Sequence, residues 1–228
     1  MNIAQLWAEL ENDQAWRQRE IRFFHNQSAK LESETEQNQF RRPLILLLYA
    51  HFEGFCKFAL CLYVKTINDE GIKCSDADYA IAAASLADLF RALRNPEKKC
   101  DDFRRTLPND TELHRFARDR EFIERISLFD KRTVNIPDHV VDTESNLKPV
   151  VLRKNLYRLG FPHDQFEDIE GKIHLLLKYR NKIAHGELLT GIDRKQYERL
   201  KDVTYKVINR IKRDVMHSLQ NKQYLRAS

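Results

Sequence analysis

The chain has 228 residues, of which 32% are charged and 42% hydrophobic, with only six glycines and six prolines. This composition is typical of a helical soluble protein and argues against a turn-rich β-sandwich, and the length suits one domain better than two. The formal net charge of +5 favours polyanionic partners but does not by itself identify a nucleic-acid-binding protein.

The cysteines show no pattern of a metal site. None forms a C-x-x-C pair or has a neighbouring histidine at the spacing of metal ligands, so we expect reduced thiols, no metal and no other cofactor. The four are Cys56, Cys61, Cys74 and Cys100. Residues 1–11 lack the basic start and apolar core of a secretory signal, and we therefore expect a cytoplasmic protein.

The first predicted helix runs from Ile3 to about Leu31. Its expected apolar side consists of Leu6, Leu10, Trp16 and Phe23 or Phe24. The polar segment 32–39 contains no glycine or proline, and it either continues this helix or forms a short link.

The second predicted helix runs from about Arg41 to Asn68 and stops at Gly71. We expect it to start near Pro43, because proline is tolerated in a first helical turn. Apolar residues surround nearly its whole circumference, which indicates the central helix of a bundle. The run is long enough to span a membrane, but the charged or polar residues within it argue against a membrane helix. These are His51, Glu53, Lys57 and Lys65.

A third helix is predicted from Asp76 or Asp78, as its cap, to Asn95-Pro96. An irregular charged insertion follows at about 96–147. Within it, Thr111 to Phe129 regains helical spacing through Leu113, Phe116, Phe122 and Ile126. Its arginines are interleaved with acidic residues, so a solvated face is a better interpretation than a phosphate-binding groove. The rest of the insertion is predicted to be loop.

Two further predicted helices flank segment 178–187, which holds the strongest candidate for a functional site. A short helix from Leu147 to Leu159 closes at Gly160, and a last helix runs from Asp193 to Leu219. The last helix should turn its aliphatic residues inward and its basic residues mostly outward. These basic residues are Lys201, Lys206, Arg210, Lys212 and Arg213.

Between them, a helix from about Gln165 ends in Lys178-Tyr-Arg-Asn-Lys-Ile-Ala-His-Gly-Glu187. Arg180 falls on the apolar stripe Ile169, Ile173, Leu176, Ile183, whereas His174, Lys178, Asn181 and His185 form a polar stripe. Gly186 provides a left-handed cap, which places His185 among carbonyls that favour a cation. Either Arg180 merely snorkels and His185 merely caps the helix, or the two residues do chemistry.

Two charged side chains on apolar helix faces are candidates for an ion pair. A carboxylate on the central helix needs a partner, and Arg180 is the other charge on an apolar face, so we hypothesise that Glu53 pairs with Arg180. The alternative is that Glu53 faces solvent. Gly54, beside it, is expected to permit close helix approach.

The string Arg180-Asn-Lys-Ile-Ala-His185 resembles the R-x4-6-H signature of the HEPN superfamily. Together with three other strings it is similar to the MAE-type (RiboL-PSP-HEPN-like) branch, and the likeness covers nearly the whole chain. The other strings are Trp16-Arg-Gln-Arg-Glu-Ile21, Leu47-Leu-Tyr-Ala-His-Phe-Glu-Gly-Phe55 and Thr143-Glu-Ser-Asn-Leu147. The resemblance implies an all-α bundle of about six or seven helices that dimerises across two signature helices.

The resemblance also implies metal-independent endoribonuclease activity that leaves 2′,3′-cyclic phosphate and 5′-hydroxyl ends. His185 would move the proton, Arg180 would bind the phosphate through its planar fork, and Asn181 would orient His185 or the substrate. The supporting residues would be Glu53, Lys178 and Tyr179, and the RNA-binding residues Lys182, Lys206, Arg210 and Arg213.

Proteins of this kind are often toxins or antiviral defence effectors, so a cognate antitoxin or regulatory subunit is an expected partner besides RNA. Two other readings stay open. One is a non-catalytic HEPN subunit that binds RNA or regulates a partner in a toxin-antitoxin or defence system, and the other is a purely structural dimer.

Overall fold

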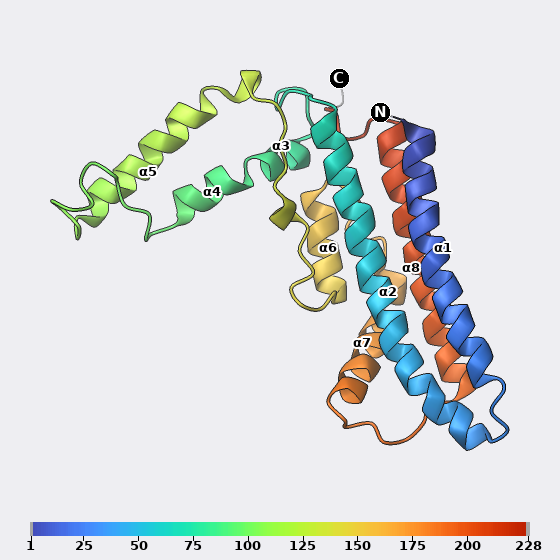
Figure 1. Ribbon diagram of the computed structural model, residues 1–228. Helices are drawn as coiled ribbons and strands as arrows, with labels where there is room; N and C mark the ends of the chain where they lie inside the picture. Colours follow the sequence, from blue (N-terminus) through green and yellow to red (C-terminus); the bar gives the residue numbers. More distant parts are fainter. Residues whose placement is uncertain (1, 227–228) are drawn as a thin grey trace.

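The computed structural model describes residues 2–226, which form eight α-helices and three short 3₁₀ helices (Figure 1). Two isolated β-bridges, Lys73 with Thr133 and Ala77 with Leu225, are the only strand-like pairings recorded in this range. The predicted all-α class is thus confirmed. The α-helices are α1 (Ile3–Ser28), α2 (Glu34–Asp69), α3 (Tyr79–Ser85), α4 (Ala87–Arg94), α5 (Thr111–Ile126), α6 (Pro149–Arg158), α7 (Glu170–Ala184) and α8 (Arg194–Gln220). The 3₁₀ helices are η1 (Phe129–Lys131), η2 (Asp138–Val140) and η3 (Glu167–Ile169).

The central helix of the bundle is α2, as its all-round apolar pattern predicted. It packs against α1, α7 and α8 (Figure 1). The side chains of Phe52, Phe55 and Tyr63 on α2 are almost fully buried. Among the described helices α2 alone is long and apolar enough to cross a bilayer, yet 56% of its most apolar stretch is buried inside the protein. Such burial is typical of a core helix.

The expected start of α2 near Pro43 is wrong, because the helix begins at Glu34 and carries Pro43 inside it. The polar segment 34–39 is therefore helical, and a short link separates it from α1. Contacts from far along the chain stabilise this extension. The Ile192 N–H donates to the Asn38 carbonyl at 2.8 Å, and a Cβ on Gly191 would lie 2.5 Å from the Asn38 carbonyl carbon.

The apolar side of α1 was only partly predicted. Leu6 and Leu10 are buried, but Trp16, Phe23 and Phe24 remain 42%, 58% and 38% exposed. The buried stripe instead passes through Gln14, whose amide donates to the Asn209 side chain at 2.7 Å, and continues at Ile21. A polar side chain can lie in this stripe because α8 supplies its hydrogen-bond partner.

Lys212 was expected to face outward and instead is buried. Its ammonium lies 2.6 Å from a carboxylate oxygen of Glu11 and 5.1 Å from the centre of the Trp7 ring. Both partners belong to α1, so this cation joins the two terminal helices. A buried ammonium is tolerated here because a carboxylate and an aromatic face replace its water.

The predicted third helix is divided at Leu86 into α3 and α4, and the Asp78 carboxylate caps α3 by accepting from the Ala80 N–H at 2.8 Å. Helices α4 and α5 form an arm that projects away from the bundle (Figure 1). Phe90 and Phe122 meet inside this arm, with ring centroids 5.8 Å apart. Phe116 is 66% exposed, although its spacing suggested a core position.

Candidate functional site

The signature residues lie at the end of α7, which closes in the way that Gly186 predicts. Gly186 has φ +71°, its N–H donates to the Ile183 carbonyl at 3.1 Å, and the Glu187 N–H donates to the Lys182 carbonyl at 2.8 Å. These are the two backbone hydrogen bonds of a left-handed glycine cap. The cap is made by the backbone alone, so the His185 side chain has no part in ending the helix.

Arg180 is half-buried between α7 and α2. Its guanidinium carbon lies 5.1 Å from the centre of the Tyr49 ring, and its Nη1 donates to the side-chain carbonyl of Asn181 at 2.9 Å. Among residues 2–226, no carboxylate lies within ion-pair distance of this guanidinium. Arg180 is therefore positioned by a ring and an amide, while its charge stays uncompensated.

The hypothesis that Glu53 pairs with Arg180 is wrong, because no ion pair joins them within the described chain. Tyr49 is adjacent to both groups instead. It lies one turn before Glu53 on α2, and its ring is almost fully buried under Arg180. Burial, followed by the neighbouring Glu53 carboxylate, raises the pKa of the Tyr49 hydroxyl well above its usual range. The tyrosine thus remains a neutral phenol at physiological pH.

His185 is exposed, and its imidazole has no hydrogen-bond or ion-pair partner within residues 2–226. Asn181, which was expected to orient His185 or the substrate, is engaged with Arg180 in the single chain. Lys178 and Lys182 are exposed on α7, whereas Tyr179 is half-buried and packs against the core. An unengaged, exposed imidazole can exchange a proton with a ligand.

Three of the four predicted RNA-binding cations lie far from His185. Lys206 is 2.9 Å from Asp168, Arg210 lies over the Phe166 ring at 5.2 Å, and Arg213 is exposed on the same helix. Asp168 and Phe166 precede α7, so these cations lie near the start of α7. His185 is at the other end of this helix, about 20 Å away for a helix of this length. Only Lys182 shares the final turns of α7.

Sequence reasoning missed Tyr49. The spacing of Tyr49 and Glu53, four residues apart on one helix, could have indicated that they share a face, but only packing shows that Arg180 covers the ring. No group of three or more His, Cys, Asp or Glu side chains placed to hold a metal ion occurs in the described part of the chain.

A helical bundle in which one helix ends in Arg180, Asn181 and His185 defines the chain as a HEPN-like domain. The family model described as MAE_28990-like HEPN matches residues 6–224, and the chain belongs to this family. No curated protein and no solved structure matches it. Membership of the HEPN superfamily suggests a ribonuclease or another RNA-related function.

Proposed function

We propose that the protein is a metal-independent endoribonuclease that leaves 2′,3′-cyclic phosphate and 5′-hydroxyl ends. In this reaction a base removes the proton of the 2′-hydroxyl, the 2′-oxygen attacks phosphorus, and an acid protonates the leaving 5′-oxygen. His185 transfers a proton, and the Arg180 guanidinium stabilises the charge that develops on the phosphate oxygens. Asn181 holds Arg180 in position for this contact.

The observation that carries this proposal is the uncompensated charge of Arg180. A charge that is partly removed from water is costly unless other groups compensate it. Arg180 has a ring beneath it and an amide beside it, but no carboxylate within residues 2–226. A phosphate suits the remaining donors, because two of its oxygens can accept in parallel from the planar guanidinium.

A homodimer would complete the site. Arg180 and His185 are five residues apart, so on a straight helix they point about 140° away from each other. A two-fold axis through the ends of two α7 helices would bring an arginine of one protomer toward a histidine of its partner. Leu189, which is 78% exposed just beyond the α7 cap, provides apolar surface for this contact.

We expect the purified protein to be a dimer at micromolar concentration, as measured by size-exclusion chromatography with light scattering. The Leu189→Asp variant should shift it toward monomer, whereas Phe23→Asp on α1 should not, although Phe23 is also exposed. A strict monomer at this concentration would remove the composite site.

The activity is tested by incubating the protein with single-stranded RNA in EDTA. We expect cleavage to continue at an undiminished rate, with products that carry cyclic phosphate ends detectable by mass spectrometry. If RNA is bound but never cut, the non-catalytic alternative, an RNA-binding or partner-regulating subunit, replaces the ribonuclease. If RNA is neither bound nor cut, the dimer is purely structural.

We further propose that the ribonuclease acts in the cytoplasm as a toxin or antiviral defence effector. Unrestrained RNA cleavage would harm the host cell, so a cognate antitoxin or regulatory subunit is the expected partner. The support is family membership together with an exposed His185 imidazole that has no partner within residues 2–226.

A further inference from the structure

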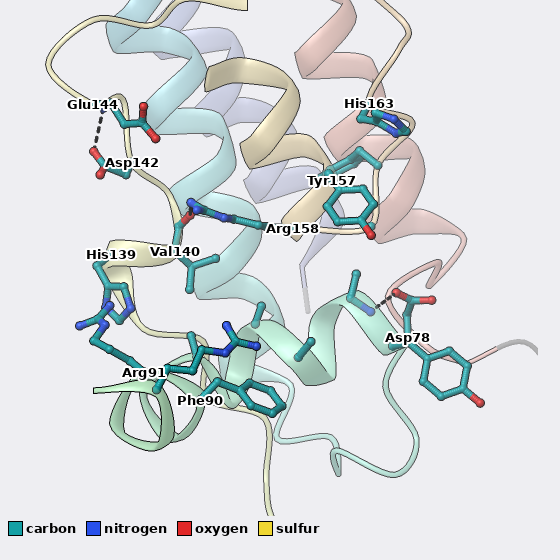
Figure 2. A pocket seen from close by; sticks show the side chains of 18 of the residues that line it. Asp78, Phe90, Arg91, His139, Val140, Asp142, Glu144, Tyr157, Arg158 and His163 are labelled. Carbon is teal, nitrogen blue, oxygen red and sulfur yellow. Dashed lines mark hydrogen bonds between the residues drawn. The ribbon is translucent and has the colours of Figure 1, made fainter. Parts of the chain in front are cut away.

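A large groove lies between the arm and the bundle (Figure 2), and His185 is not among the residues that line it. It has a volume of about 1430 Å³ and is walled by α3, α4, η2 and α6. Pockets for small molecules usually measure roughly 300–1,000 Å³, so this groove suits a longer ligand. Its floor is formed by alanines of α3 and α4, and aromatic rings and arginines surround it.

The groove is lined by charged side chains of both signs. The carboxylates along it are occupied by neighbouring donors: Asp78 accepts from the Ala80 N–H, Asp142 accepts from the Glu144 N–H, and Glu144 contacts Lys154. Arg94 lies 5.5 Å from the centre of the Phe90 ring, and Arg158 donates to the Val140 carbonyl at 3.5 Å. Neither arginine has a carboxylate partner in the described chain. Asp78 and Asp142 have no cation partner in the described chain either, so the groove carries charges of both signs, with separate cationic points at Arg94 and Arg158.

One end of the groove leads toward the signature helix. Tyr157 and His163 are neighbours there, with ring centroids 5.5 Å apart, and Figure 2 shows that Arg158 extends from α6 toward Val140. Tyr157 is 68% exposed and offers a free aromatic face. The same two residues also line a second hollow, of about 380 Å³, whose far wall includes His174 of α7.

From His174 a polar stripe continues along α7 to the candidate site. Lys178, Asn181 and His185 follow His174 at intervals of four, three and four residues, which places all of them on one face. This face is about 16 Å long. His174, Lys178 and His185 are exposed, and Asn181 is half-buried.

We propose that the groove, the Tyr157–His163 corner and the polar stripe of α7 form one track for single-stranded RNA. The inference rests on the proposed ribonuclease function and names the part of the substrate that lies beyond the cleaved bond. Arg94 and Arg158 bind phosphates, and Tyr157 stacks on a base. Stacking on an exposed ring together with unpaired cations is how proteins hold single strands without reading a sequence. The alanine floor leaves space for the chain of nucleotides.

The track is tested by measuring binding, so that the result does not depend on catalysis. The probe is a fluorescent 16-nucleotide RNA with 2′-O-methyl groups, which cannot undergo attack by its 2′-oxygens, and its affinity is followed by anisotropy. The Tyr157→Ala variant should bind it about tenfold more weakly than wild type. Arg158→Gln should lower the slope of log affinity against log salt by about 0.7, as expected for one lost phosphate contact.

Matched controls lie on α1, on another part of the bundle (Figure 1). Phe23→Ala removes an aromatic ring of similar exposure, and Arg19→Gln removes an exposed cation; both should leave affinity and salt slope unchanged. A four-nucleotide probe should bind at least tenfold more weakly than the longer one. Circular dichroism checks that each variant is folded.

If the long and short probes bind with equal affinity, or if the α6 variants bind like their α1 controls, the proposed track is wrong. This holds even when the protein cuts RNA. If the α6 variants lose affinity while unmodified RNA is never cut, the track stands and the proposed catalysis fails. If the α1 control variants also lose affinity for the long probe, the proposed track is wrong.

Discussion

Replacing His185 by alanine is expected to lower RNA cleavage about 10²- to 10⁴-fold, the loss typical of a missing general acid or base. The helical fold and the dimer should persist. The imidazole is exposed and has no partner in the described residues, and the helix cap that follows is made by backbone hydrogen bonds of Gly186 and Glu187. Initial rates in EDTA and circular dichroism of the same preparation measure the two properties separately.

The matched control for this variant is His217→Ala, which removes an exposed histidine of α8. It should cleave RNA at the wild-type rate. Should the His185→Ala protein also cut RNA at the wild-type rate, with contaminating nucleases excluded, His185 would be only a residue at a helix end and the proposed site would be wrong.

Replacing Arg180 should reduce cleavage about 10²- to 10³-fold, as expected when a group that stabilises transition-state charge is lost. Arg180→Lys should fail nearly as badly as Arg180→Ala, because an ammonium cannot bind two phosphate oxygens in one plane. Arg180→Ala gives up the contact with Tyr49, which costs about 0.5–2 kcal/mol of the free energy of unfolding. Thermal melting should therefore shift by a few degrees only.

The control for the lysine variant is Arg199→Lys, at an exposed position of α8, which should retain full activity. A mixture of His185→Ala and Arg180→Ala protomers then tests the dimer site. If each site draws on both chains, one of the two sites in a mixed dimer keeps both residues, and partial activity returns. An active Arg180→Lys enzyme would show that Arg180 acts as a simple point charge.

The positions of most helices follow from local rules and were predictable. The end of α7 at His185 follows from Gly186, which takes φ +71°, and the start of α8 follows from Asp193, whose carboxylate accepts from the Gln196 N–H at 2.9 Å. The central place of α2 follows from its all-round apolar surface. The residues Arg180, Asn181 and His185 were recognised by their spacing and by family resemblance, neither of which depends on knowing the fold.

What no local rule predicts is which groups from distant segments meet. The loop before α8 donates a hydrogen bond to the Asn38 carbonyl, and Lys212 is buried because Glu11 and Trp7 of α1 surround it. The partner of Arg180 is likewise a tertiary outcome: the carboxylate of Glu53 was the obvious candidate by charge, and the ring of Tyr49 is what the guanidinium covers. Periodicity assigns a side chain to a face of its own helix, but the burial and the partner of that side chain depend on the element packed against that face.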